Sequence, residues 1–156
     1  GTFSTSVAAT SISTCTPCPK GTFSNVIGAS SLASCTACQL GTFADNVGLS
    51  QCKFCSAGFF GNVTGLAACY PCPMGTFVSR SGASSCDTCP AGTFNPKGGQ
   101  IFAMDACQKC AAGYYSDQTA ATSNSTCLPC PIGTFSTVSG ASSLSMCLPC
   151  PAGTVR

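Results

Sequence analysis

One short pattern recurs along the whole chain and contains every cysteine in it. Its clearest copy, residues 127–136, reads CLPCPIGTFS: two cysteines three positions apart, a glycine three residues after the second cysteine, and an aromatic residue two after that glycine. In the last copy Val155 stands in the aromatic position. The sixteen cysteines form eight such pairs, which are Cys15 and Cys18, Cys35 and Cys38, Cys52 and Cys55, Cys69 and Cys72, Cys86 and Cys89, Cys107 and Cys110, Cys127 and Cys130, and Cys147 and Cys150.

Counting from the glycine that precedes each aromatic residue divides the chain into repeats of 17 to 21 residues. Repetition at a fixed period indicates a stacked array in which each unit contacts its neighbours. The copy that begins the chain and the one cut short at its end start at the same phase, so we expect a piece of a longer array. The predicted domain is one continuous array of eight units, 1–20, 21–40, 41–57, 58–74, 75–91, 92–112, 113–132 and 133–152, with the start of a ninth at 153–156.

The length variation is confined to one place in the unit. A second glycine lies four residues before the first cysteine in the shorter units, as Gly65 does before Cys69, and seven before it in longer ones, as Gly28 does before Cys35. Surface loops tolerate such insertions at small entropic cost. We therefore predict that segments such as 28–35 are loops and that the Gly-Thr-Phe-Ser segment keeps its place in every unit.

Residue types predict short hairpins. Thr-Phe-Ser alternates polar and aromatic residues, which suits a short strand with its ring on one face. A proline after the second cysteine, such as Pro19 or Pro131, favours an extended cysteine and a turn toward the glycine. No helical periodicity is present. The predicted fold class is a small disulfide-rich repeat, an elongated rod of short irregular β-hairpin units with little regular secondary structure and no helix bundle.

Stacked units would bring the aromatic residues into one file. We predict that the rings form a minimal apolar spine, and the alternative is an exposed aromatic ladder that binds a ligand. The positions are Phe3, Phe23, Phe43, Phe60, Phe77, Phe94, Tyr115 and Phe135.

Composition indicates an oxidising compartment and excludes several functions. Cysteine at this density is typical of secreted disulfide-rich domains, so we expect an extracellular or cell-surface protein. Only 6% of residues are charged, with a net charge of +2, and the six basic residues are scattered. A nucleic-acid partner needs a clustered basic face, and a membrane span needs about 18 apolar residues in a row. The sequence shows neither.

Paired C-x-x-C motifs also occur in zinc ribbons, and several spacers here approach the zinc spacing. The extracellular composition, the absence of histidine and the scarcity of lysine and arginine near the pairs favour disulfides over zinc. Redox activity is disfavoured because no thioredoxin-like context surrounds the eight copies. We therefore predict that all sixteen cysteines form disulfides and that no metal or other cofactor binds.

Spacing alone leaves two regular connectivities open. In the crossed scheme, consecutive pairs bond first to first and second to second, as Cys15 to Cys35 and Cys18 to Cys38. In the ladder scheme, each second cysteine bonds the first cysteine of the next unit, as Cys18 to Cys35, which leaves Cys15 and Cys150 for flanking repeats.

Two glycosylation sequons occur, at Asn62 and Asn124. Neither contains proline and both fall in predicted loops, so we expect N-linked glycans there. The serine- and threonine-rich segments 4–14 and 136–145 are possible O-glycan sites. Sugar would then supply the hydrophilicity that the sparse charge does not.

Catalysis has no candidate residues. Histidine and glutamate are absent, and the four aspartates fall in four different units. General acid–base chemistry and calcium sites need companion groups that a lone aspartate lacks. We predict no enzyme activity and no small-molecule substrate. The aspartates are Asp45, Asp87, Asp105 and Asp117.

The pattern resembles the ephrin-receptor-like cysteine-rich repeats, most clearly over residues 15–24, 69–78 and 127–136, and more distantly tumour-necrosis-factor-receptor modules. Departures such as Gln39 or Ser56 in the proline position leave the pattern intact. The resemblance implies small extracellular modules that form rods, and it is the basis for preferring the crossed disulfides. Long arrays of this type are similar to surface and mastigoneme-like fibre proteins of protists and algae.

Two functions follow as hypotheses. The first is a non-enzymatic building block of an extracellular fibre, stalk or surface coat, whose partners are other copies in the assembly. The second is a ligand-binding receptor ectodomain, which predicts aromatic or arginine anchors in one or two units. The candidate anchors are Phe54, Phe59, Tyr70, Phe102 and Tyr114.

Overall fold

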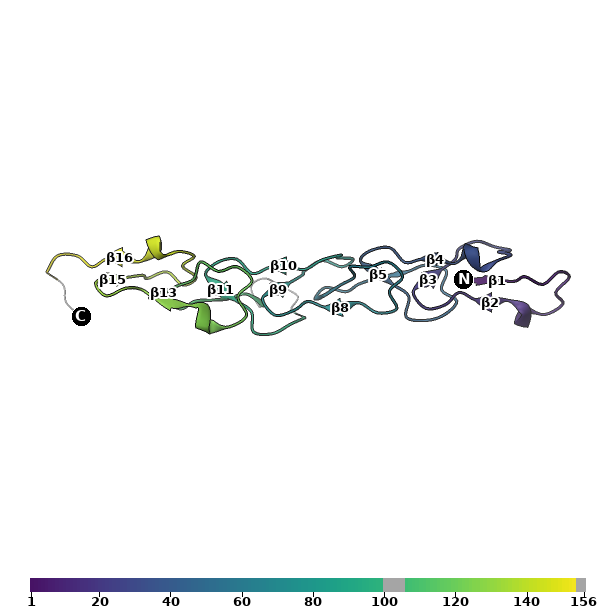
Figure 1. Cartoon of the computed structure of the whole chain (residues 1–156), viewed down its shortest axis with the longest axis horizontal. Helices are drawn as coiled ribbons and strands as arrows, with labels where there is room; N and C mark the ends of the chain where they lie inside the picture. Colours follow the sequence, from purple (N-terminus) through teal and green to yellow (C-terminus); the bar gives the residue numbers. More distant parts are fainter. Residues whose placement is uncertain (100–105, 154–156) are drawn as a thin grey trace. The chain divides into compact units, whose positions relative to one another are not determined.

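The computed structural model describes residues 1–99 and 106–153 (Figure 1). The chain divides into two compact units, Gly1–Tyr70 with Arg80–Ser85 and Pro71–Ser79 with Cys86–Arg156. Within the described residues each unit is made of short antiparallel hairpins and single 3-10 turns, with no helix bundle. The predicted fold class, a small disulfide-rich repeat with little regular secondary structure, is confirmed. The elongation of the whole array stays a prediction.

Each repeat folds as one hairpin of two-residue strands. The first strand holds the residue after the starting glycine and the aromatic residue, and the second strand holds the two residues between the paired cysteines. The pairs are β1 (Thr2–Phe3) with β2 (Thr16–Pro17), β3 (Thr22–Phe23) with β4 (Thr36–Ala37), β5 (Thr42–Phe43) with β6 (Lys53–Phe54), β9 (Thr76–Phe77) with β10 (Asp87–Thr88), β11 (Thr93–Phe94) with β12 (Gln108–Lys109), β13 (Tyr114–Tyr115) with β14 (Leu128–Pro129), and β15 (Thr134–Phe135) with β16 (Leu148–Pro149). In repeat 58–74, β7 (Phe59–Phe60) and β8 (Tyr70–Pro71) occupy the same two positions.

A tight turn leads from the second cysteine of one repeat into the first strand of the next, as predicted. The Thr22 amide donates to the Pro19 carbonyl at 3.1 Å, and the Thr22 hydroxyl donates to the same oxygen at 2.7 Å. Gly21 stands at the third position of this turn with φ of 82°, which is the left-handed conformation that a type II turn requires there. The threonine that follows the glycine therefore stabilises the turn with two hydrogen bonds, one from its amide and one from its hydroxyl.

The insertion that lengthens some repeats folds as a single 3-10 turn. Four such turns are described, η1 (Ile12–Thr14), η2 (Leu32–Ser34), η3 (Asn124–Thr126) and η4 (Leu144–Met146). Each lies in one of the repeats 1–20, 21–40, 113–132 and 133–152, directly before the first cysteine. In η2 the Cys35 amide donates to the Leu32 carbonyl at 2.9 Å, so the three extra residues satisfy their own backbone. The predicted loop 28–35 thus contains local structure.

The buried interior consists of half-cystines and small residues. Five of the second cysteines are fully buried: Cys18, Cys38, Cys55, Cys89 and Cys110. Four alanines are at most 5% exposed: Ala44, Ala83, Ala121 and Ala141. Small side chains are required because backbones of successive repeats approach within hydrogen-bonding distance.

The prediction that the aromatic file forms the apolar spine is wrong. None of the eight aromatic positions is buried, and Phe135 is 39% exposed. Phe77 packs against the buried cluster of Cys89, Ala106 and Cys107, and the rings of Phe60 and Tyr70 lie 6.0 Å apart in a tilted pair. The rings therefore flank the interior, because the close backbone approach leaves no room for them inside it.

Candidate functional site: the junctions between repeats

The disulfides join consecutive repeats in a ladder. Each second cysteine bonds the first cysteine of the next repeat, with Cα–Cα distances between 5.5 and 5.8 Å. The seven bridges are Cys18–Cys35, Cys38–Cys52, Cys55–Cys69, Cys72–Cys86, Cys89–Cys107, Cys110–Cys127 and Cys130–Cys147. Fourteen cysteines are therefore bonded, whereas Cys15 is a half-buried thiol and Cys150 an exposed thiol.

The crossed connectivity preferred from the family resemblance is wrong. The strand between the paired cysteines prevents crossed pairing. Cys35 and Cys38 flank the two residues of β4, and residues three apart on an extended strand project to opposite sides. One cysteine of a pair therefore faces the preceding repeat and the other faces the following one, so both cannot bond the same neighbour.

Backbone hydrogen bonds link each repeat to the next. The Gly21 amide donates to the Ala44 carbonyl at 2.9 Å, and the Ser24 amide donates to the Leu49 carbonyl at 3.1 Å. The same two bonds recur in the second compact unit, where the Gly92 amide donates to Ser116 and the Asn95 amide donates to Ala121, both at 2.8 Å. The junction is thus a repeated structure that satisfies polar backbone groups which would otherwise be buried without partners.

A further hydrogen bond reaches two repeats back. The amides of Gly48, Gly65 and Gly82, the second glycines of their repeats, donate to the carbonyls of Cys18, Cys38 and Cys55 at 2.8–2.9 Å. These glycines have φ between 73° and 76°, the left-handed region. This bond explains why the second glycine keeps a fixed distance from the first and why length varies only after it. Ala8 and Ala120 adopt the same conformation with φ of 54°.

Several of the starting glycines are also required by close backbone approach, namely Gly1, Gly21, Gly41, Gly75 and Gly92. A Cβ atom added to Gly41 would overlap the carbonyl oxygen of Gly82, and one added to Gly92 would overlap that of Gly140. A Cβ at Gly113 would meet nothing within 4 Å. The glycine pattern in the sequence therefore records contacts between repeats as well as turn geometry, and the sequence by itself reveals only the turn.

The two sequon asparagines are exposed. Asn62 lies between Gly61, whose amide donates to the Ala83 carbonyl of the next repeat, and Gly65, whose amide donates to the Cys38 carbonyl two repeats back. Residues 62–64 are exposed. Asn124 begins η3, where its carbonyl accepts from the Cys127 amide at 3.0 Å. Their glycosylation stays a prediction, since the structure shows only that both side chains are accessible.

The four candidate ligand anchors that the structure describes are exposed. Phe54, Phe59, Tyr70 and Tyr114 are 69%, 40%, 49% and 43% exposed, and Phe102 lies outside the described residues. A shallow pocket of about 250 Å³ is lined by Phe43, Asp45, Ser56, Phe59, Ala67, Ala68 and Cys69. Phe59 is the one candidate anchor among these lining residues.

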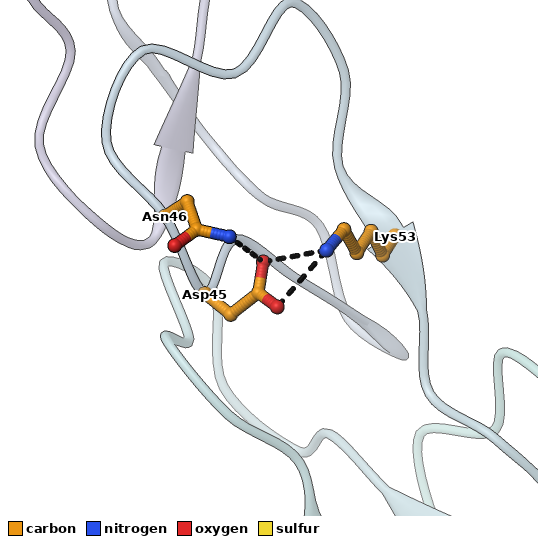
Figure 2. Close-up of polar contacts among 3 residues, drawn as sticks. All are labelled: Asp45, Asn46 and Lys53. Carbon is orange, nitrogen blue, oxygen red and sulfur yellow. Dashed lines mark hydrogen bonds and ion pairs between the residues drawn. The ribbon is translucent and has the colours of Figure 1, made fainter.

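Asp45 and Lys53 form an ion pair at the surface. Figure 2 shows the Lys53 ammonium between the two carboxylate oxygens of Asp45, each at 2.9 Å, with the Asn46 amide donating to the same carboxylate at 3.3 Å. The hydrogen bond from Lys53 lowers the pKa of Asp45. Both side chains are about half exposed, and such pairs contribute little to stability.

Asp87 and Asp117 lie in other repeats, and Asp105 lies outside the described residues. Within the described ranges no three histidine, cysteine or acidic side chains gather in a way that could hold a metal ion. The same ranges contain no helix long and apolar enough to cross a membrane.

The fold and its junctions define a class of protein: an extracellular-type array of cysteine-rich repeats joined by disulfides. Three stretches, residues 27–65, 58–101 and 99–147, match the family described as tyrosine-protein kinase ephrin type A/B receptor-like. Together they span most of the chain, and the chain belongs to this family. The family is a non-catalytic type of extracellular cysteine-rich domain. A comparison with curated proteins finds no match.

Proposed function

We propose that the chain is a non-enzymatic structural element of an extracellular fibre, stalk or surface coat. The observation that carries this proposal is the ladder, in which the same disulfide arrangement joins successive repeats and one or two recurring backbone hydrogen bonds accompany each bridge. Adding a further repeat extends such an array without changing its interior. A structural element needs this property, whereas a catalyst needs one singular cluster of groups.

The distribution of surface residues supports the structural role. The exposed aromatic side chains are spread over several repeats, and the pocket at Phe59 contains a single candidate anchor. Binding hot spots instead cluster in one well-packed region of an interface. The partners we propose are therefore other copies of the same protein in an extracellular assembly.

Electron microscopy of the native material tests this role. Regular fibres or a layered coat that bind antibody raised against residues 1–156 are the expected result. Dispersed molecules that carry a stoichiometric soluble protein would contradict it.

A ligand-binding receptor ectodomain is the second candidate, because the description of the matching family refers to receptor kinases. The pocket beside Phe43 and Phe59, which is open and largely apolar, also favours it. The receptor candidate predicts that Phe59→Ala abolishes capture of a ligand, whereas Tyr114→Ala, in another repeat, does not. The structural proposal predicts that neither substitution prevents assembly.

We also propose N-linked glycans at Asn62 and Asn124. Both side chains are exposed, and the surface carries few charges to keep it solvated. Mass spectrometry of the protein from a secreting eukaryotic host should show glycan mass on both sequon peptides. The variants Asn62→Gln and Asn124→Gln should each lose one of the two.

A further inference from the structure

The ladder creates a covalent path through the chain that is far shorter than the chain itself. From Cys35 the path follows three residues to Cys38, crosses the bridge to Cys52, follows three more to Cys55, and continues in the same way. Each bridge closes a separate loop of 14 to 18 residues, and no two of these loops overlap. Every hairpin loop therefore lies off the path.

The two routes from Cys18 to Cys147 differ about fourfold in length. A peptide spans at most about 3.3–3.6 Å per residue, so the unbridged chain between these residues could reach about 450 Å. Through the seven bridges, whose Cα–Cα distances are 5.5–5.8 Å, the reach is about 100 Å. This limit follows from connectivity alone and does not depend on how the two compact units are placed.

The peptide segments on this path are already extended. They are the second strands of the hairpins, such as β4, β6 and β10, and two of them contain prolines that hold φ fixed, Pro71 in β8 and Pro129 in β14. Strands rise about 3.3 Å per residue, close to the maximum for a peptide. These segments can therefore lengthen only slightly under tension.

We propose that the array is a tensile strap whose covalent path carries pulling force and keeps it nearly inextensible while its disulfides are intact. Force applied along the chain passes through the bridges and the second strands. The backbone hydrogen bonds between repeats, which are individually weak in water, do not carry the load. This inference deepens the structural role proposed above by naming what the junctions resist.

Single-molecule force spectroscopy on the oxidised chain, held by handles fused at both ends, tests the proposal. The oxidised chain should show no stepwise lengthening between Cys18 and Cys147, and its unbridged ends, residues 1–17 and 148–156, should add at most about 90 Å. When a small thiol reductant is added under force, seven steps should appear, about 45 Å for each 14-residue loop and about 55 Å for each 17- or 18-residue loop. Lengthening by hundreds of ångströms without reductant, or steps of other sizes, would overturn it.

A pair of variants locates the effect. Cys72→Ser with Cys86→Ser opens one loop and should lengthen the oxidised chain by about 45 Å under force. Cys15→Ser with Cys150→Ser changes two thiols that lie outside the ladder and should leave its length unchanged. If the Cys72→Ser and Cys86→Ser substitutions prevent folding, the steps that reductant produces in the parent chain still show whether the bridges limit its length. An inextensible molecule that forms no fibre would refute the assembly role and leave the strap intact.

Discussion

At the scale of single residues, glycine controls how closely repeats approach. Gly92 and Gly113 have the same place in their repeats and similar φ values of 80° and 85°. They differ in surroundings, because a Cβ at Gly92 would overlap the Gly140 carbonyl and one at Gly113 would meet open space. Conformational strain and steric overlap can therefore be separated at two matched positions.

We expect Gly92→Ala to destabilise the protein more than Gly113→Ala. A left-handed φ costs a non-glycine residue about 1–2 kcal/mol, and both variants bear that cost. Gly92→Ala adds overlap with a neighbouring backbone, for which overpacking costs of about 1–3 kcal/mol are typical. Chemical denaturation of the oxidised proteins measures the difference, and equal losses would show that the two repeats do not approach as described.

The carboxyl group of Asp45 should titrate below the usual range for aspartate, because the hydrogen bond from Lys53 stabilises its charged form. A depressed pKa stabilises the folded state above the unfolded pKa, and that contribution is lost as the pH falls through the folded pKa. Because the pair is exposed, we expect an NMR titration to show the shift and Lys53→Met to reduce it, with no measurable change in Tm between pH 5 and 8. A normal midpoint in the parent protein would contradict the ion pair.

At the scale of the element, the hairpin is constant and the 3-10 turn is dispensable. The repeats with η2, η3 and η4 close disulfide loops of 17 residues, whereas the shorter repeats close loops of 14. The Cα–Cα distance is 5.7–5.8 Å across the 14-residue loops and 5.6–5.7 Å across the 17-residue loops. The extra turn therefore changes the surface and leaves the junction geometry as it was.

Deleting residues 144–146 should preserve the fold. The deletion makes this repeat read Gly-Ala-Ser-Ser-Cys before its bridge, as residues 82–86 do. Peptide mapping without reduction should still find Cys130 bonded to Cys147. Deleting residues 140–142 has the same length but removes Gly140, whose amide donates to the Cys110 carbonyl at 2.8 Å, and should lower thermal stability. Equal behaviour of the two deletions would show that the fixed spacing of the second glycine is unimportant.

At the scale of the whole molecule, disulfides replace a large apolar core. Among the described residues, the largest fully buried side chains are Val78, Asn95, Ser116 and six of the eight second cysteines. Many large apolar side chains, such as Ile27 and Ile132, are fully exposed. Closing a loop of about 15 residues contributes roughly 3 kcal/mol in the chain-entropy model. The stability of this protein therefore depends on its oxidised state.

Reduction should unfold each compact unit. Hydrogen exchange monitored by mass spectrometry should show protection of the Gly48 and Gly65 amides in one unit and of the Gly99 and Gly140 amides in the other. That protection should be lost on reduction, because no large apolar cluster remains to hold the repeats together. Reduced protein that keeps these amides protected would show that packing alone stabilises the array.

The sequence by itself determined the hairpin in each unit, the turn into the glycine and the disulfide-rich class, because these depend on residues near one another in the chain. It did not decide the disulfide partners or the composition of the interior. Cysteine spacing is compatible with crossed bridges and with a ladder, and only the alternation of side chains along the short second strand assigns Cys35 and Cys38 to different neighbours. The regular recurrence of the aromatic residues predicted that they form the core. The tertiary structure places half-cystines and alanines there, because repeats that exchange backbone hydrogen bonds approach too closely to admit a ring.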